Sequence, residues 1–209
     1  RQLIEYMGST FGLPYDVLKG AIAEADGAME LFGRTLRDEG AKALRRIRET
    51  GGFGIVLACR PYHNDSLVNH DISRIFTRQG IPVLTIDSLP DINAKDMRLA
   101  RAEATINFHV RMMAAAIAVG ENPDLELVQL VSFGCGHDAI LTDEVIRIMH
   151  AVSKKDPLVL KVDESSVAGP LNIRSKSFIE TIRARRSKKA LSGIFALEDP
   201  FPVKFLKKD

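Results

Sequence analysis

The stretch LVQLVSFGCGHDAILTDEVIRIMH, residues 127–150, contains an apolar run, a cysteine between two glycines and a helical pattern in succession. The run at 127–132 is typical of a buried strand, because strands covered on both faces are apolar at nearly every position. Farther along, apolar side chains recur at three- and four-residue spacing, which predicts a helix over 138–152. Cys135 therefore lies where a strand ends and a helix begins.

The same order of apolar run, polar loop and helical pattern occurs elsewhere in the chain. Short apolar runs predict further strands at 53–58, 82–86 and 157–163. Helical spacing predicts helices over 66–79, 94–119 and 174–188. Residues 1–50 are also helical in pattern, and Gly51 and Gly52 end that region.

Strands that alternate with helices favour parallel pairing through right-handed crossovers. We therefore expect an α/β fold that is Rossmann-like and doubly wound, with a mainly parallel sheet of about four strands in the order 2-1-3-4. Helices should cover both faces of the sheet. The expected organisation is a helical N-terminal extension packed on the same domain, then the α/β domain, then a tail or linker, at 1–50, 51–190 and 191–209.

The composition argues against several classes of partner. The 209 residues are 45% hydrophobic, which is enough to bury a core, and the formal net charge is only +2. Basic residues do not gather on one aromatic-bearing face, so we expect no nucleic acid partner. No apolar run approaches the ~20 residues that span a bilayer, and the start lacks a secretion signal, so we expect a cytoplasmic protein with no membrane partner. The first residue is not methionine, which suggests a piece of a longer polypeptide.

The two cysteines, Cys59 and Cys135, follow the first and third predicted strands. In the order 2-1-3-4 these strands are neighbours, and the direction of the crossovers reverses between them. The crevice outside the carboxyl ends of the strands at such a reversal is the usual ligand site. We therefore expect both cysteines on neighbouring loops, although they are far apart in sequence.

The residues around the cysteines suit an anionic ligand. Gly134 and Gly136 permit backbone conformations and close approaches that a side chain would prevent. The helix that follows them offers unpaired N–H groups at its positive end. In the loop CRPYHND, Arg60 is a charged donor, and Tyr62 and His63 can donate or accept. These five residues and both cysteines are the candidate cofactor-binding residues.

The residues alone leave several roles open for the cysteines. A free cysteine usually packs as a small apolar side chain. A disulfide between Cys59 and Cys135 is geometrically conceivable but unusual in a reducing cytoplasm. A thiolate could also carry out acyl transfer on a thioester if His63 reached it across the crevice as a base. Ligation of a metal or an iron–sulfur cluster is a further possibility.

Three segments carry a resemblance to a known family: LACRPYHNDSLVNHDISRIFTRQGIPVLTIDSLP, NPDLELVQLVSFGCGHDAILTDEVIRIM and PLVLKVDES. Over roughly residues 50–185, the chain resembles the large proteins related to 2-hydroxyacyl-CoA dehydratases and their activators, the CoA-substrate-specific enzyme activases. Such proteins commonly join an ATP-hydrolysing activator region to dehydratase-like regions. The dehydratase-like regions adopt Rossmann-like domains and bind a 4Fe-4S cluster through cysteines.

The resemblance implies an iron–sulfur-dependent redox component that acts on CoA thioesters in anaerobic metabolism. Cys135 matches the family's cysteine and is the first candidate metal ligand. Cys59, where relatives often have glycine, is the second candidate. A four-iron cluster normally takes four cysteine ligands. The others would come from other domains of the same polypeptide or from a dehydratase or activator partner, so the isolated piece can lack the cluster and is expected to be inactive.

The chain departs from the family's pattern after its fourth predicted strand. Relatives tend to have a histidine-containing acidic segment after LKVD, whereas this chain has ESSVAGPLN. The role of that histidine is therefore not carried over. The leading interpretation implies an acyl-CoA ligand. The alternative is a non-redox domain of a larger protein that binds CoA or a nucleotide, or that serves as a scaffold.

Overall fold

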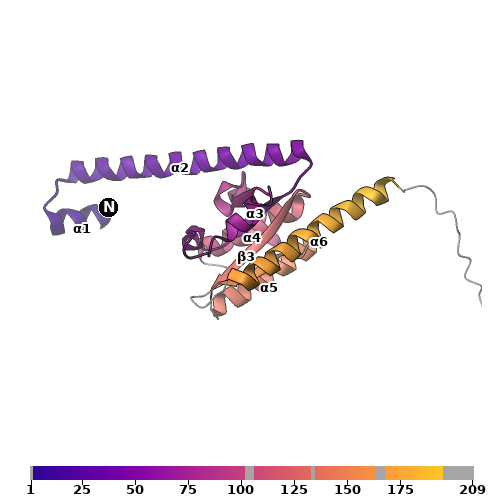
Figure 1. The fold of residues 1–209 in the computed structure, drawn as a ribbon. Helices are drawn as coiled ribbons and strands as arrows, with labels where there is room; N and C mark the ends of the chain where they lie inside the picture. The colour runs from indigo at the N-terminus through magenta and orange to yellow at the C-terminus, as the bar shows by residue number, and fades with distance from the viewer. Residues whose placement is uncertain (1, 102–105, 133–134, 163–167, 195–209) are drawn as a thin grey trace, which may run out of the picture. The chain divides into compact units, whose positions relative to one another are not determined.

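The computed structural model describes residues 2–101, 106–132, 135–162 and 168–194 (Figure 1). The chain divides into two compact units, Arg1–Ser166 and Val167–Asp209. Within the described residues, the second unit consists of one helix, α6 (Ala168–Ile194). All strands and the remaining helices belong to the first unit.

A four-stranded parallel sheet forms the centre of the first unit. Its strands are β1 (Gly54–Ala58), β2 (Val83–Thr85), β3 (Leu125–Ser132) and β4 (Leu158–Val162). The order is β2-β1-β3-β4, which confirms the predicted topology. Every residue of β1 is buried, as expected for a central strand covered on both faces.

The helices between the strands are α3 (Ile72–Thr77), α4 (Asn107–Glu121) and α5 (Gly136–Val152). Because crossovers of this kind are right-handed, α3 lies on the face of the sheet opposite to α4 and α5. Consistent with this, α4 and α5 share one core cluster with alternate residues of β1 and β3, and the cluster contains no residue of α3. Its members include Val56, Ala58, Leu127, Met112, Met113, Leu141, Val145 and Ile148. The fold is thus α/β and Rossmann-like, as predicted.

Two helices precede the sheet, as the helical pattern of residues 1–50 predicted. The first, α1 (Gln2–Phe11), lies alongside the N-terminal part of the second, α2 (Tyr15–Thr50) (Figure 1). Gly51 ends α2 in the left-handed conformation, with φ of 63°, and its N–H donates to Arg48 O. Glycine adopts this conformation without steric cost, which explains the end of the helix.

The helix expected over 66–79 was wrong in its first half, because α3 begins only at Ile72. The Asp65 carboxylate accepts hydrogen bonds from the backbone N–H groups two and three residues later, at 2.8 and 3.4 Å. His70 and Asp71 then adopt left-handed conformations, with φ of 53° and 57°. Local side-chain bonds of this kind compete with helix formation, and left-handed residues interrupt it.

The helix expected over 94–119 was also wrong at its start, because α4 begins at Asn107. The described part of the segment before it contains short 3-10 turns, and two of its backbone groups bond to side chains of α5. Glu144 Oε1 accepts from the backbone N–H of Arg101 at 2.6 Å, and Arg147 donates to the carbonyl of Leu99. The short 3-10 helices of the chain are η1 (Pro61–Asn64), η2 (Ile86–Ser88), η3 (Ile92–Ala94) and η4 (Met97–Leu99).

At the C-terminal end, α6 extends to Ile194, past the predicted end near residue 188. Residues 195–209 of the predicted tail lie outside the described residues. No helix in the described part of the chain is both long and apolar enough to cross a membrane.

We predict that Gly40→Ala destabilises the protein, because a Cβ there would lie 1.8 Å from the carbonyl oxygen of Ser88. Overpacking of this kind costs roughly 1–3 kcal/mol, so the free energy of unfolding should fall by about 2 kcal/mol in urea titrations. Gly20→Ala is the matched control, because a Cβ at Gly20 meets nothing within 4 Å. It should leave stability unchanged or raise it by about 0.5–1 kcal/mol. Equal effects of the two changes would contradict close packing of α2 on η2.

Candidate functional site

The candidate site lies where β1 and β3, which pair side by side, reach their carboxyl ends. The loop after β1 contains Cys59 and Arg60 and continues into η1, and the turn after β3 leads to Cys135 at the start of α5. Arg60 Nη2 donates a hydrogen bond to Cys135 Sγ at 3.2 Å. The two loops are therefore in contact, although 75 positions separate these residues.

Arg60 connects several groups of the site. Its Nη2 also donates to Asp138 Oδ1 at 2.6 Å, and its Nη1 donates to Tyr62 Oη at 3.1 Å. The guanidinium carbon lies 5.8 Å from the centre of the Phe108 ring, within the range of a cation–π contact. Burial alone would lower the pKa of Arg60, but its bonds to Cys135, Tyr62 and Asp138 outweigh that effect and raise it. The site therefore holds a permanent positive charge beside a thiol.

Cys135 is half-buried and is the N-cap residue of α5. The backbone N–H of Asp138 is the largest cause of a lowered pKa for its thiol, and the hydrogen bond from Arg60 is the next. A helix N-terminus and a neighbouring cation both favour the thiolate over the thiol. Cys135 is therefore suited to act as a nucleophile or as a metal ligand.

Cys59 has a different environment, although the two loops are neighbours. Its side chain is buried, and its Sγ lies 3.4 Å from Asn64 Oδ1, to which the thiol donates. Burial raises the pKa of this thiol to about 12, so it stays protonated at neutral pH. Both cysteines are free thiols rather than a disulfide. This environment favours packing, and ligation of a metal by Cys59 stays a prediction.

Tyr62, Ser132 and His63 form a chain of hydrogen bonds behind Arg60. Tyr62 Oη lies 3.2 Å from Ser132 Oγ, which in turn lies 3.2 Å from His63 Nε2. Because the Arg60 guanidinium can only donate hydrogen bonds, the Tyr62 hydroxyl accepts one from it and can donate one to Ser132 Oγ. With that direction of bonding, Ser132 Oγ donates to His63 Nε2, and the ring hydrogen of a neutral His63 lies on Nδ1.

His63 is suited to that neutral state. Only 2% of the residue is exposed, and burial, followed by the charge of Arg60, lowers its pKa. Its buried Nδ1 has no hydrogen-bond partner within the described part of the chain. The imidazole bonds to Ser132 rather than to a thiol, so the arrangement gives no direct support to the thiolate–imidazole pair considered above.

The structure brings most of the predicted site residues together. Arg60 and Tyr62 contact the Cys135 side of the crevice directly, and His63 reaches it through Ser132. Gly136 is the first residue of α5, and a Cβ there would meet nothing within 4 Å, so close packing does not require a glycine. Gly134 lies outside the described residues, as does the neighbouring residue 133.

Sequence reasoning missed two parts of the site. Asp138 is buried and accepts from Arg60 and, through Oδ2 at 3.0 Å, from the backbone N–H of Ser132. The position of Asp138 in the first turn of a predicted helix, where acidic residues are favourable, was the sequence feature that could have identified it. Phe108 and His109 were missed because the predicted helix placed them in its interior, whereas they begin α4. The His109 and His137 rings lie 5.9 Å apart between centres.

A metal site can be tested against the donors present. The described residues contain no group of three or more His, Cys, Asp or Glu side chains that could hold a metal ion. They therefore do not form a complete site for a four-iron cluster, which takes four ligands. Cys135 alone fits the role of one ligand, because its thiol pKa is lowered and its side chain is not fully buried.

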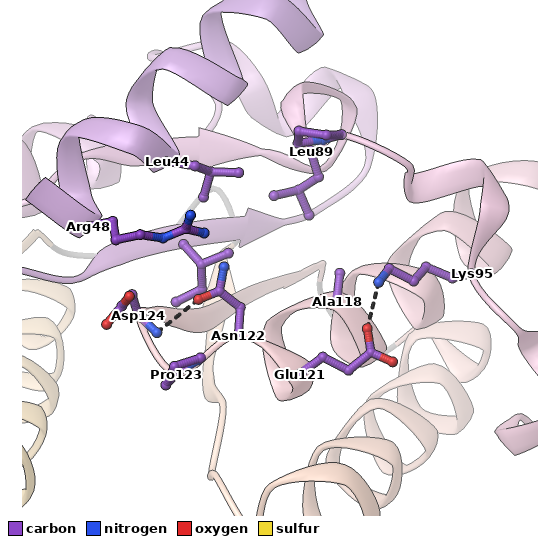
Figure 2. A pocket seen from close by; sticks show the side chains of 11 residues that line it. Leu44, Arg48, Leu89, Lys95, Ala118, Glu121, Asn122, Pro123 and Asp124 are labelled. Atoms are coloured by element: carbon purple, nitrogen blue, oxygen red, sulfur yellow. Dashed lines mark hydrogen bonds and ion pairs between the residues drawn. The ribbon is translucent and has the colours of Figure 1, made fainter.

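A separate pocket lies near the amino ends of the strands, opposite to the strand ends that carry the cysteines (Figure 2). It has a volume of about 370 Å³ and lies beside Leu125, the first residue of β3. Leu44, Leu89 and Ala118 form apolar walls. At its rim, Lys95 is paired with Glu121 at 2.5 Å. This pocket is remote from the strand ends that carry the cysteines, and it contains no candidate site residue.

We predict that Cys135 is alkylated by iodoacetamide at lower pH than an ordinary cysteine. Only the thiolate reacts, so the rate rises with pH through the thiol pKa, and a lowered pKa moves the midpoint below the usual value of about 8.5. Cys59→Ala should leave this profile unchanged, and the raised pKa of Cys59 should make Cys135→Ala nearly unreactive at neutral pH.

Removal of the guanidinium tests the cause of this shift. Arg60→Met should move the midpoint for Cys135 upward, because one hydrogen bond to the thiolate is lost. Arg98→Met is the control, since Arg98 is exposed and pairs with Asp96 elsewhere on the surface. A midpoint that is the same in all variants would contradict the contact between Arg60 and Cys135.

Comparison with known proteins gives one family match. Residues 1–89 match the family described as the CoA enzyme activase uncharacterised domain. The matched region contains α1, α2, β1 and β2 and includes Cys59, Arg60, Tyr62 and His63, but it ends before Cys135. Neither the curated proteins nor the solved structures gave a match. Over residues 1–89, this chain is therefore similar to the CoA enzyme activase family.

Proposed function

We propose that this chain is a domain of a CoA enzyme activase-type protein that contributes Cys135 as one thiolate ligand of a 4Fe-4S cluster. The protein would deliver a low-potential electron to a thioester of the 2-hydroxyacyl-CoA type. The family match supports a CoA-related, activase-like domain. The iron–sulfur role rests on the chemistry of the Cys135 environment and on the resemblance of its motif.

The single observation that carries the proposal is the environment of the Cys135 thiol. The first turn of α5 and Arg60 both stabilise a thiolate there, at the point where ligands bind in doubly wound sheets. A thiolate is the form that ligates iron. Cys59 shares the crevice but is buried and protonated, so Cys135 is the better ligand.

Arg60 would have a second role beside a cluster. Hydrogen bonds to ligand sulfurs and nearby charge are among the factors that set cluster potentials. Arg60 donates such a bond to Cys135 Sγ, and Asp138 and Tyr62 hold the guanidinium in place. When bound, the cluster supplies one-electron transfer, while these residues of the chain fix one ligand and exclude alternative conformations of it.

The remaining ligands would come from other domains of the same polypeptide or from a dehydratase or activator partner. The described residues hold too few donors for a complete cluster, so assembly at this crevice requires such a contribution. An acyl-CoA would then bind at the same carboxyl ends of the strands, near the positive charge of Arg60.

The test is to purify the full-length natural protein without oxygen and to measure iron, acid-labile sulfide and the electron paramagnetic resonance spectrum after reduction. Cys135→Ala should lose the reducible cluster signal, because one iron loses its ligand. Cys59→Ala is the matched control and should retain the signal, because its thiol packs against Asn64. Circular dichroism should show the same helix content in all three proteins.

Unchanged iron, sulfide and spectrum in Cys135→Ala would contradict the proposal. Loss of the signal in both variants would instead make Cys59 a second ligand and would revise the packing role given to it here. Cys135→Ser separates loss of sulfur from loss of volume, and it should also weaken or abolish the signal.

A second candidate function is binding of CoA or a nucleotide without redox chemistry. Three buried nitrogen atoms near the crevice favour it, because they have no hydrogen-bond partner in the described structure: Arg60 Nε, His63 Nδ1 and His109 Nε2. Buried polar atoms usually have partners, so a ligand with acceptor atoms would suit them. A colourless protein whose melting temperature rises with added CoA, and less so in Arg60→Met, would favour this function.

A further inference from the structure

The loop between β1 and α3 lies over the buried thiol of Cys59. We call residues 60–69 of this loop the strap. Within it, Asn69 Nδ2 donates a hydrogen bond to the carbonyl of His63 at 2.7 Å. Asn64, at the end of η1, approaches Cys59 Sγ through its Oδ1 at 3.4 Å. A reagent therefore reaches the Cys59 thiol more easily when the strap moves away from the end of β1.

The side chain of His63 fastens the strap to the sheet. Only 2% of the residue is exposed, and its Nε2 lies 3.2 Å from Ser132 Oγ at the end of β3. The hydroxyl of Tyr62 lies 3.2 Å from the same Ser132 Oγ. The buried Nδ1 of His63 has no hydrogen-bond partner within the described part of the chain. Two strap residues thus bond to one hydroxyl, and the imidazole lies out of water.

Two charged groups among the described residues act on the imidazole of His63: Arg60 from the strap and Asp138 from α5. Arg60 opposes a second positive charge nearby. Asp138 would favour one, but its carboxylate is already paired with Arg60 at 2.6 Å and also accepts from the backbone N–H of Ser132. Tyr62 is a titratable neighbour as well, with its ring centre 4.5 Å from that of the imidazole.

This environment favours a neutral His63 while the strap is closed. Burial is the largest cause of the lowered pKa of His63, and the charge of Arg60 is the next. With the strap open, the imidazole would be hydrated and its pKa would return to the ordinary value of about 6.5. A histidine whose pKa is lower in the closed state stabilises that state above its ordinary pKa. That stabilisation is lost as the pH falls below about 6.5.

We propose that His63 is a pH-sensitive latch: when its imidazole gains a proton, the strap opens and withdraws Arg60 from Cys135. A protonated imidazole donates from both nitrogens, so Ser132 would have to turn its own hydrogen from His63 to Tyr62. The new charge would also lie beside the guanidinium without hydration, which is unfavourable. Outward movement of the strap hydrates it. The crevice is thus closed at neutral pH and open in acid, whether or not Cys135 holds a cluster.

The first test uses hydrogen exchange of the full-length natural protein and requires no substitution. Each exchange rate is divided by the rate for an unstructured chain at the same pH. Opening of the strap should increase about tenfold between about pH 7.5 and 5.5, the change for one group with an open-state pKa of about 6.5 and a much lower closed-state pKa. Amides of β1 should keep their protection. No increase in the strap, or an equal increase in β1, would contradict the latch.

The reactivity of Cys59 measures the same opening independently. A dipyridyl disulfide, which also reacts with thiols in acid, should modify Cys59 faster as the pH falls, relative to the same thiol in the urea-unfolded chain. Mass spectrometry of the Cys59 peptide separates it from other cysteines. His63→Gln should remove the pH dependence, because glutamine stays neutral and its amide oxygen can accept from Ser132.

His109→Gln is the matched control. His109 is also buried and also has a pKa lowered by burial, but it belongs to α4 rather than to the strap. It should keep the pH dependence of the natural protein. A dependence that persists in His63→Gln, or that disappears in His109→Gln, would overturn the latch. Circular dichroism at neutral pH should show equal helix content, and hydrogen exchange of the natural protein decides the matter if His63→Gln does not fold. Iron is not measured, so failure of the iron–sulfur proposal would leave these results unchanged.

Discussion

The contact between Arg60 and Asp138 joins the two loops on which the candidate site depends, the loop after β1 and the start of α5. The Nη2 and Oδ1 atoms are 2.6 Å apart, and the side chains are only 19% and 8% exposed. Charges withdrawn from water attract each other more strongly but lose hydration. The loss is offset here because Asp138 also accepts from Ser132 and Arg60 also donates to Tyr62. With either partner removed, the other would remain as a partly buried, unpaired charge.

The two cysteines illustrate how position within one crevice decides chemistry. Both follow strands that pair with each other, and the sequence places both in loops at the same ends of those strands. Cys59 directly follows β1, the central and fully buried strand, and its thiol lies against Asn64. Cys135 lies beyond the end of β3, where the N–H groups of α5 and the guanidinium of Arg60 meet it. Burial disfavours the thiolate form of Cys59, whereas backbone N–H groups and Arg60 favour the thiolate form of Cys135.

Much of the fold could be predicted from the sequence, because apolar runs bounded by glycine and polar loops identify strands, and the strand order is a common one for doubly wound sheets. The contact between the Arg60 and Cys135 loops followed from that order. The partners of the side chains could not be predicted, because Asp138 lies 78 positions from Arg60. The two helix errors have a related cause. Hydrogen bonds that the carboxylates of Asp65 and Glu144 accept from backbone N–H groups replace helical bonds that periodicity alone would suggest.

The long helix α2 has a mechanical consequence. At about 1.5 Å per residue, the 25 positions between Tyr15 and Gly40 span roughly 37 Å. Because Gly40 lies against the backbone of Ser88, the helix can neither slide nor deform there without moving η2. A rotation of about 5° at that contact would displace Tyr15 by roughly 3 Å. A force applied near the N-terminus of α2 is therefore transmitted to η2 and to the edge strand β2, which continues directly into η2.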